Sequence, residues 1–278
     1  MLKKPDIEVA DIFRMHGDQY RSSHNLSLWQ HKTMNAIQLC RTPALGANSQ
    51  TVCDYCGTVE ISYNSCRNRH CPKCQFRRTL NWIDARINDL LPVQYFHVVF
   101  TLPDLLEPII LMNQKIMYNL LFKCASETLI ELGKDQKHLG AEVGFIGVLH
   151  TWDQKILEHT HLHCIVPGGG LSLDQTKWIS CKNDYLIPVQ VLSALFKKKF
   201  LYYLKILMKE DKLKYGRGIG QTVQLFKIIS KLYKIEWVVY SKPTFNSPES
   251  VIKYLGKYTH RIAISNYRIL ELKNNRVS

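Results

Sequence analysis

The sequence predicts an α+β protein in which a small cysteine-rich module precedes a larger domain with a central, mainly antiparallel sheet flanked by helices. Six of the nine cysteines lie between Cys40 and Cys74, in a stretch with many turn-forming residues and little apolar periodicity. Beyond residue 90, short runs of aromatic and β-branched residues alternate with longer runs of helical apolar spacing. We therefore expect residues 1–90 to hold a helical lead-in and a zinc-binding module, and residues 91–278 to form the sheet domain.

Five strands are expected in this sheet, because five short apolar runs are bounded by proline, glycine or polar residues. They cover residues 95–102, 145–151, 159–166, 236–240 and 261–264. About seven residues separate the second strand from the third, which favours an antiparallel hairpin. Helices are expected at residues 7–15, 80–91, 104–133, 188–209 and 222–233, and from Pro248 onward, where Ser247 provides a cap.

Composition excludes several classes of protein. Of the 278 residues, 46% are hydrophobic and 22% are charged, so the chain can bury a core and is not expected to be disordered. No apolar run reaches the ~18 residues of a membrane span, and the N-terminal stretch MLKKPDIEVADIF lacks the apolar core of a signal peptide. We expect a cytoplasmic protein with no membrane partner, in which cysteines bind metal or are buried thiols.

The net charge of +14 indicates a polyanionic partner, most simply nucleic acid. The charge is uneven along the chain. Residues 181–278 carry 19 basic and 6 acidic side chains, whereas residues 91–180 carry 6 basic and 9 acidic ones. The middle of the chain therefore suits a bound cation better than a phosphate backbone.

The cysteine module contains two C-x2-C pairs with the spacing of a zinc ribbon. Each pair places two thiolates on one side of a metal, and together they supply four soft ligands. The expected zinc ligands are Cys53, Cys56, Cys71 and Cys74. The remaining candidates for a second, mixed site are Cys40, Cys66, His70 and His31. A cluster of buried free thiols is the alternative for both sets.

Three histidines alternate in His159-Thr160-His161-Leu162-His163. On a strand they share one face, and burying three imidazoles without partners would be costly. A divalent metal site explains them better than a row of packed histidines. The glycines at 168–170 follow directly and would let a ligand approach the backbone closely.

Tyr254 and Tyr258 are four residues apart on one expected helix and share one face of it. Cations surround them, so that the phenols lie where a phosphate would bind and are easier to ionise. Tyrosine can act as a covalent nucleophile, although an aromatic pair packed on the sheet is the alternative. The candidate DNA contacts are Arg67, Arg69, Lys253, Lys257 and Arg261, which could equally be solvated surface charges.

Taken together, these motifs resemble the HUH nucleases, whose metal motif is histidine-hydrophobic-histidine, as in His161-Leu162-His163. More closely, the chain resembles the two-tyrosine rolling-circle transposases of bacterial insertion sequences, which carry an N-terminal zinc-binding domain. The resemblance covers residues ~1–270, with motifs in the same order. The matching stretches are CRTPALG, NSCRNRHCPKCQ, FHVVFTLP, HTHLHCIVPGGG and YLGKYTHRIAISN.

The resemblance implies an enzyme that nicks and rejoins single-stranded DNA at element ends and target. His161 and His163 would hold Mg²⁺ or Mn²⁺, and Tyr254 and Tyr258 would form 5′-phosphotyrosine links. Gln154, seven residues before His161, is the favoured third metal ligand, and His159 is the alternative. The zinc is structural.

Two other functions compete with this one. A plasmid replication initiator or relaxase would use the same chemistry, but the cysteine module argues against it. A non-catalytic, zinc-dependent DNA-binding remnant is the third hypothesis. Family members usually continue well past the fifth strand, whereas this chain ends at Ser278, which favours a C-terminally truncated copy.

Overall fold

The structure is a computed structural model that describes residues 5–153, 157–181, 186–215, 222–244, 247–259, 264–274 and 276–278. The chain divides into two compact units, which we call the cysteine unit (Met1–Ala85 with Gly256–Ser278) and the sheet unit (Arg86–Leu255). The sequence-based division kept residues 91–278 in one domain. In the structure the last segment of the chain belongs with the N-terminal residues.

The sheet unit is built on a four-stranded antiparallel sheet with the strand order β5-β6-β3-β9. Its strands are β3 (Tyr95–Thr101), β5 (Ile146–Trp152), β6 (Glu158–Pro167) and β9 (Val239–Pro243). The expected α+β class and the hairpin between the second and third strands are confirmed. Of the expected fifth strand, residues 261–263 lie outside the described residues.

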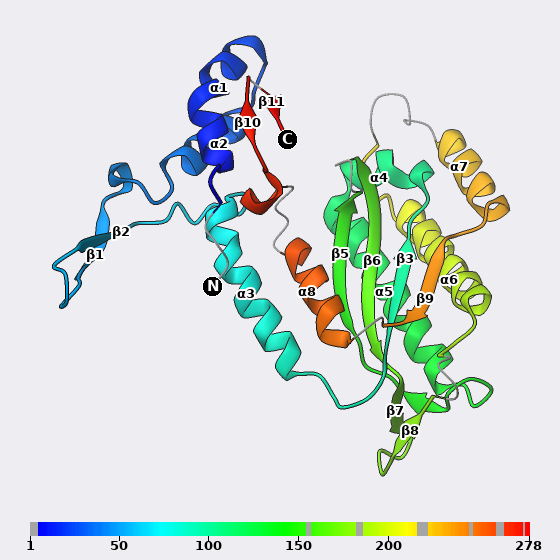
Figure 1. Cartoon of the computed structure of the whole chain (residues 1–278). Coiled ribbons are helices and arrows are strands. Elements are labelled where there is room, and N and C mark those ends of the chain that lie inside the picture. Colours follow the sequence, from blue (N-terminus) through cyan, green and yellow to red (C-terminus); the bar gives the residue numbers. More distant parts are fainter. Residues whose placement is uncertain are drawn as a thin grey trace. The chain divides into compact units, whose positions relative to one another are not determined.

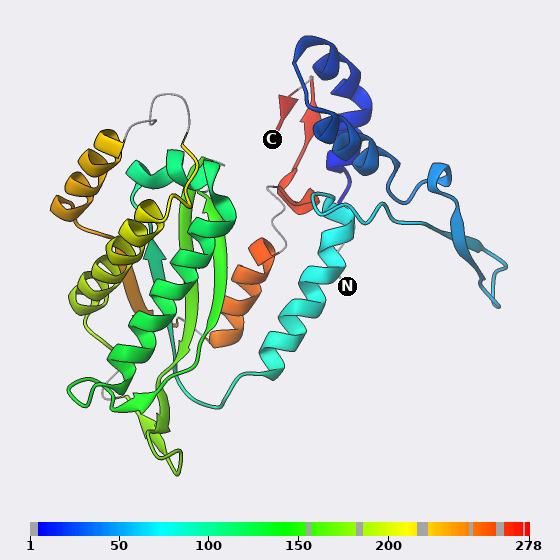
Figure 2. The same ribbon diagram turned by 180° about the vertical axis from the view of Figure 1, so that it is seen from behind.

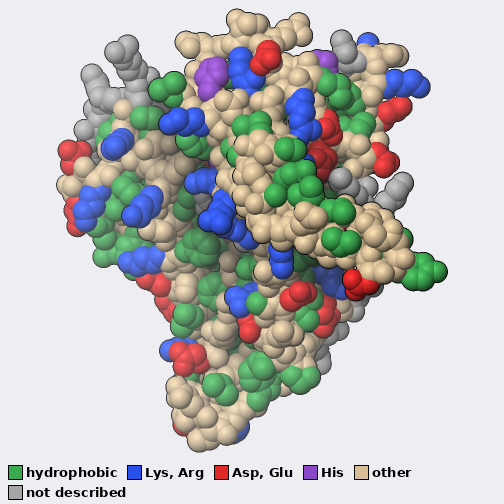
Figure 3. Space-filling view, turned by 90° about the vertical axis from the view of Figure 1, so that its left-hand side faces the viewer, with side chains coloured by type: hydrophobic (Ala, Val, Ile, Leu, Met, Phe, Trp, Pro, Cys, Tyr) green, Lys and Arg blue, Asp and Glu red, His purple; other side chains and the backbone are tan. Residues whose placement is uncertain are grey.

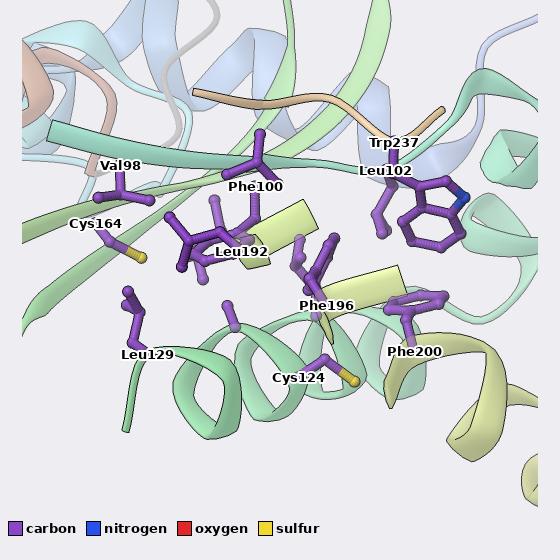
Figure 4. Close-up of a cluster of buried hydrophobic side chains, with 14 of the residues drawn as sticks. Val98, Phe100, Leu102, Cys124, Leu129, Cys164, Leu192, Phe196, Phe200 and Trp237 are labelled. Carbon is purple, nitrogen blue, oxygen red and sulfur yellow. The ribbon is translucent and has the colours of Figure 1, made fainter. Parts of the chain in front are cut away.

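One face of this sheet is the core of the unit. Alternate residues of β3 and β6 point toward two long helices, α5 (Gln114–Lys134) and α6 (Val189–Lys209), which Figures 1 and 2 show on the same side of the sheet. Phe100 from β3 packs against Phe196 from α6, with ring centroids 4.9 Å apart and the rings tilted at 52° to each other. Figure 4 shows Trp237 and Phe200 completing the aromatic cluster. Because this face is fully packed, the opposite face is the one on which polar side chains can gather.

The long helix expected at residues 104–133 is interrupted at Asn113, between α4 (Glu107–Met112) and α5. The Asn113 side chain accepts a hydrogen bond from the Lys214 backbone N–H at 2.7 Å and donates to the Ile109 and Lys214 carbonyls. A buried amide with these partners replaces helical hydrogen bonds, which explains the break. The remaining helices are α7 (Thr222–Lys234) and α8 (Pro248–Thr259).

The glycines after β6 lie very close to the backbone of neighbouring strands. Gly169 and Gly170 open β7 (Gly169–Ser172), the middle strand of a second antiparallel sheet with β4 (Ala141–Glu142) and β8 (Trp178–Ser180). A Cβ on Gly170 would clash with the Glu142 carbonyl, and one on Gly169 would lie 2.6 Å from the Ile179 carbonyl oxygen. The glycines are required because neighbouring strands approach them closely.

We expect Gly170→Ala to destabilise the sheet unit by about 1–3 kcal/mol, because the added methyl group meets backbone that cannot turn away. Chemical denaturation followed by circular dichroism measures the change. Gly144→Ala is the matched control, since a Cβ there meets nothing within 4 Å. An equal loss of stability in both variants would contradict this explanation.

The cysteine unit starts with two helices, α1 (Val9–Ser23) and α2 (Leu28–Leu39), of which the second was not expected. Ser27 and Gln30 form a reciprocal capping box at the start of α2, a signal present in the sequence. A hairpin of β1 (Ala47–Val52) and β2 (Val59–Tyr63) follows. The next helix, α3 (Pro72–Asn88), begins eight residues before its expected start at 80.

The end of the chain packs into the core of this unit. Asn266 accepts a hydrogen bond from the Val9 backbone N–H at 3.1 Å, and Ile269 is buried in a cluster with Val9 and Ile37. A short hairpin of β10 (Leu272–Lys273) and β11 (Arg276–Val277) ends the described chain. No helix among the described residues is long and apolar enough to cross a membrane.

Candidate metal centres

Four cysteines converge in the cysteine unit, from three separate segments. Cys40 caps the C-terminus of α2, Cys66 follows β2, and Cys71 and Cys74 flank the start of α3. The four sulfur atoms lie within 4.8 Å of one another. The Cys74 sulfur lies 3.5 Å from that of Cys40 and 3.6 Å from that of Cys66. Zn–S bonds of 2.3 Å in a tetrahedron would separate the sulfurs by about 3.8 Å, so this cluster fits one zinc ion.

The surroundings of this cluster favour a structural role. Cys40 and Cys71 are fully buried and belong to the small apolar core that includes Val9 and Ile37. Burial raises the pKa of the Cys66 thiol to about 12 in the metal-free chain, whereas hydrogen bonds from Cys40 and Cys71 lower the pKa of Cys74. A cation would be needed to hold all four as thiolates, and four protein ligands leave no open position for a substrate.

The structure groups the cysteines differently from the zinc-ribbon spacing. Cys53 and Cys56 lie at the exposed turn between β1 and β2 and are not part of the four-sulfur cluster. Cys40 and Cys66, which we assigned to a second site, take their places beside Cys71 and Cys74.

His70 and His31, the histidines of the expected second zinc site, are not part of the four-cysteine cluster. The His70 ring lies edge-on to Trp29 at 4.9 Å, and His31 lies on α2 outside the described cluster. Arg67 and Arg69 are exposed and lie in the sequence between Cys66 and Cys71.

The second centre is a histidine cluster on the sheet face opposite the core. His161 and His163 come from β6, as expected, and His150 comes from the neighbouring strand β5, where it pairs directly with His161. One ring nitrogen from each lies within 4.8 Å of the others. The His163 Nε2 atom is 3.0 Å from the His150 Nδ1 atom. This is about the separation of adjacent ligands on a cation with bonds of about 2.1 Å.

His150 is a candidate ligand that the sequence analysis does not identify. The expected hairpin of the second and third strands could have identified it, because the hairpin places His150 in the strand that pairs with the histidine motif. His159 lies at the rim instead, with its Nδ1 atom 3.6 Å from an Asp104 carboxylate oxygen. The register of β6 against β5 is irregular next to His159, between His150 and Trp152. The His159 ring still lies near the cluster, with its centroid 5.0 Å from that of His161. Gln154 lies outside the described residues.

Buried contacts fix the orientation of these imidazoles. The Nδ1–H group of His161 donates to the His159 carbonyl at 2.7 Å, which leaves its Nε2 lone pair for a metal. The buried Glu107 carboxylate accepts a hydrogen bond from the Thr160 backbone N–H at 2.8 Å. This contact holds β6 in place between His159 and His161. His97 on β3 lies on the same face beside the cluster, with its Nε2 atom 2.7 Å from His163 Nδ1.

Burial favours the neutral form of the clustered imidazoles. Burial lowers the pKa of His163 to about 2 and that of His150 to about 3, with smaller contributions from the neighbouring imidazoles. Burial also lowers the pKa values of His161 and His97. Neutral imidazole is the form that binds metal, so the site can accept a cation at neutral pH without first losing a proton.

The tyrosine helix is α8. Its N-terminal part, which carries Tyr254 and the exposed Lys253, falls in the sheet unit. The Tyr254 side chain is 43% exposed. The side chains of Tyr258 and Lys257 and the whole of Arg261 lie outside the described residues. Basic side chains are interspersed with acidic and apolar ones over the surface drawn in Figure 3, so the net charge forms no single patch on that face.

Comparison with known proteins agrees with this arrangement. Residues 144–278 match a family model described as "Putative transposase", and residues 12–102 match the transposase zinc-binding domain. The chain is 48% identical over 274 residues to "Putative transposase y4qJ" of Sinorhizobium fredii, covering 97% of this chain and 69% of that protein. It is 30% identical over 258 residues to the transposase for insertion sequence element IS801 of Pseudomonas savastanoi pv. phaseolicola, covering 87% of this chain and 58% of the relative.

These matches confirm the resemblance that the motifs indicated, and the four-cysteine cluster lies inside the segment that matches the zinc-binding domain. The chain belongs to the family of insertion-sequence transposases with an N-terminal transposase zinc-binding domain.

Proposed function

We propose that this protein nicks and rejoins single-stranded DNA at the ends of a mobile element, through a 5′-phosphotyrosine intermediate of rolling-circle transposition. The observation that carries the proposal is the cluster of His150, His161 and His163, which forms on the face of the antiparallel sheet opposite its hydrophobic core, in a member of a transposase family. DNA as substrate also favours action in the bacterial cytoplasm.

The three histidines would hold the divalent cation, Mg²⁺ or Mn²⁺, and the bound cation would polarise the scissile phosphate. An all-imidazole donor set suits Mn²⁺ better than Mg²⁺, which prefers oxygen ligands. The neutral imidazoles need no deprotonation to bind it, and their hydrogen bonds to His159 and His97 hold them in place.

The covalent step belongs to the tyrosines of α8. The hydroxyl of Tyr254 or Tyr258 would lose its proton and attack the phosphorus, and the 3′-oxygen of the preceding nucleotide would leave. The DNA 5′ end is then held as a phosphotyrosine ester, and a free 3′-hydroxyl can reverse the reaction on another strand. The number of phosphodiester bonds is conserved, so no nucleotide triphosphate is needed.

A denaturing gel tests this mechanism directly. Labelled single-stranded DNA from the ends of the encoding element, mixed with protein and Mn²⁺, should give a slowly migrating covalent adduct. We expect the adduct to disappear in the double variant Tyr254→Phe/Tyr258→Phe and to persist in Tyr202→Phe, an exposed tyrosine on α6. If the wild-type protein forms no adduct, the non-catalytic DNA-binding function replaces this one.

A further inference from the structure

The edge strand β9 presents an exposed strip beside the histidine cluster. Along β9, Val239 is buried against the core, while Tyr240 and Lys242 are exposed, as is Val238 just before the strand. The register pairs Tyr240 with Val99, and Val99 with His163, so all three residues lie on the same face of the sheet. Tyr240 and the metal cluster therefore share one surface, although the metal site does not use Tyr240.

The spacing between this strip and the cluster is short. Tyr240 and His163 are separated by two strand intervals, about 10 Å. His97 lies between them, with its ring 5.8 Å from that of Tyr240 in an edge-on arrangement and its Nε2 atom 2.7 Å from His163. Lys242 pairs with His97 across the strands, and its Nζ atom lies 5.7 Å from the centre of the Tyr240 ring.

The chemistry of the strip fits a nucleotide. An aromatic side chain of this kind can stack on a base, and the adjacent ammonium group can neutralise a phosphate. The sequences of β3 and β9 contain no Asp or Glu, so neither strand places a carboxylate on this face to repel the DNA backbone. Lys242 alone would be enough to bind a simple anion. A nucleotide would use both side chains, because its base can stack on Tyr240 while its phosphate contacts Lys242.

We infer that Tyr240 and Lys242 form a subsite for the nucleotide that flanks the scissile phosphate, in which Tyr240 stacks on the base and Lys242 binds its phosphate. The inference rests on the proposed function, because the histidine cluster marks where the scissile phosphate lies. It assigns a DNA-positioning role to residues outside both the metal site and the tyrosine helix.

Binding without added Mn²⁺ or Mg²⁺ separates this inference from the nicking reaction. Fluorescence anisotropy of the zinc-loaded protein with labelled oligo(dT) and with single-stranded element ends, in buffer without either cation, measures affinity alone. We expect Tyr240→Ala to weaken binding about 5- to 100-fold, as for loss of one stacked base, and Tyr240→Phe to bind like the wild type. Lys242→Gln should lower the slope of log affinity against log salt by about 1.

Matched variants make the outcome decisive. Tyr202→Ala, an exposed tyrosine on the helix side of the sheet, should leave binding unchanged, and Tyr240→Val replaces the alanine variant if that one does not fold. Wild-type affinity in Tyr240→Ala or Tyr240→Val overturns the subsite, even if the wild-type protein forms the covalent adduct. Loss of the adduct in Tyr240→Phe would also overturn it, because the hydroxyl would then act in the chemistry. Failure of the wild-type protein to form an adduct counts against the proposed function instead.

Discussion

Replacing Cys71 with serine is expected to release zinc from the protein and to unfold the cysteine unit. Cys71 is fully buried, and its sulfur belongs to the four-cysteine cluster that joins α2, the segment after β2, and the start of α3. Structural zinc contributes about 10–16 kcal/mol of apparent binding free energy. That exceeds or matches the whole stability of a typical domain, about 5–15 kcal/mol, so the unit should not fold without the ion.

Zinc content per chain and thermal unfolding measure this effect. The double variant Cys53→Ser/Cys56→Ser is the matched control, because both cysteines are exposed at the β1–β2 turn and lie outside the cluster. We expect this control to keep one tightly bound zinc ion and its melting temperature. Loss of that ion from the control as well as from Cys71→Ser would instead support the ligand set that the C-x2-C spacing suggested, which shares Cys71 with the observed cluster.

Replacing His150 is expected to weaken the binding of the proposed divalent cation strongly. His150 provides the third nitrogen of the cluster, and its ring is buried beside those of His161 and His163. Loss of a residue that merely orients a metal ligand costs about 10- to 100-fold in affinity. Loss of a ligand itself should therefore weaken Mn²⁺ binding by at least about 100-fold and abolish adduct formation.

Electron paramagnetic resonance of free Mn²⁺ measures the affinity independently of DNA cleavage. His150→Gln serves beside His150→Ala, because it retains more of the volume of the buried ring. His159→Ala is the control, since His159 lies at the rim near Asp104, and it should bind Mn²⁺ like the wild type. Gln154→Ala tests the remaining candidate. A greater loss in His159→Ala or Gln154→Ala than in His150→Gln would show that the third ligand has been assigned wrongly here.

Most of the secondary structure could be predicted from local patterns. The strand expected at residues 95–102 is Tyr95–Thr101, and the helix expected at 188–209 is Val189–Lys209. Both have strong periodicity, and tertiary contacts reinforce rather than override it. The start of α3 at Pro72 differs from the expected start at residue 80, because residues 72–79 are assigned to the cysteine module on account of Cys71 and Cys74. Cys74 in fact lies in the first turn of the helix.

Local sequence patterns are enough to identify the residue types that can bind metal and the strand on which the histidine motif lies. Periodicity along one strand is local, so His161 and His163 could be assigned to one face in advance. Contacts between distant segments determine which candidate ligands meet. The register of β5 against β6 brings in His150, whereas His159 lies at the partly exposed rim near Asp104. The convergence of the end of α2, the segment after β2 and the start of α3 likewise brings Cys40 and Cys66, and not Cys53 and Cys56, beside Cys71 and Cys74, because ligand sets depend on contacts between segments far apart in the chain.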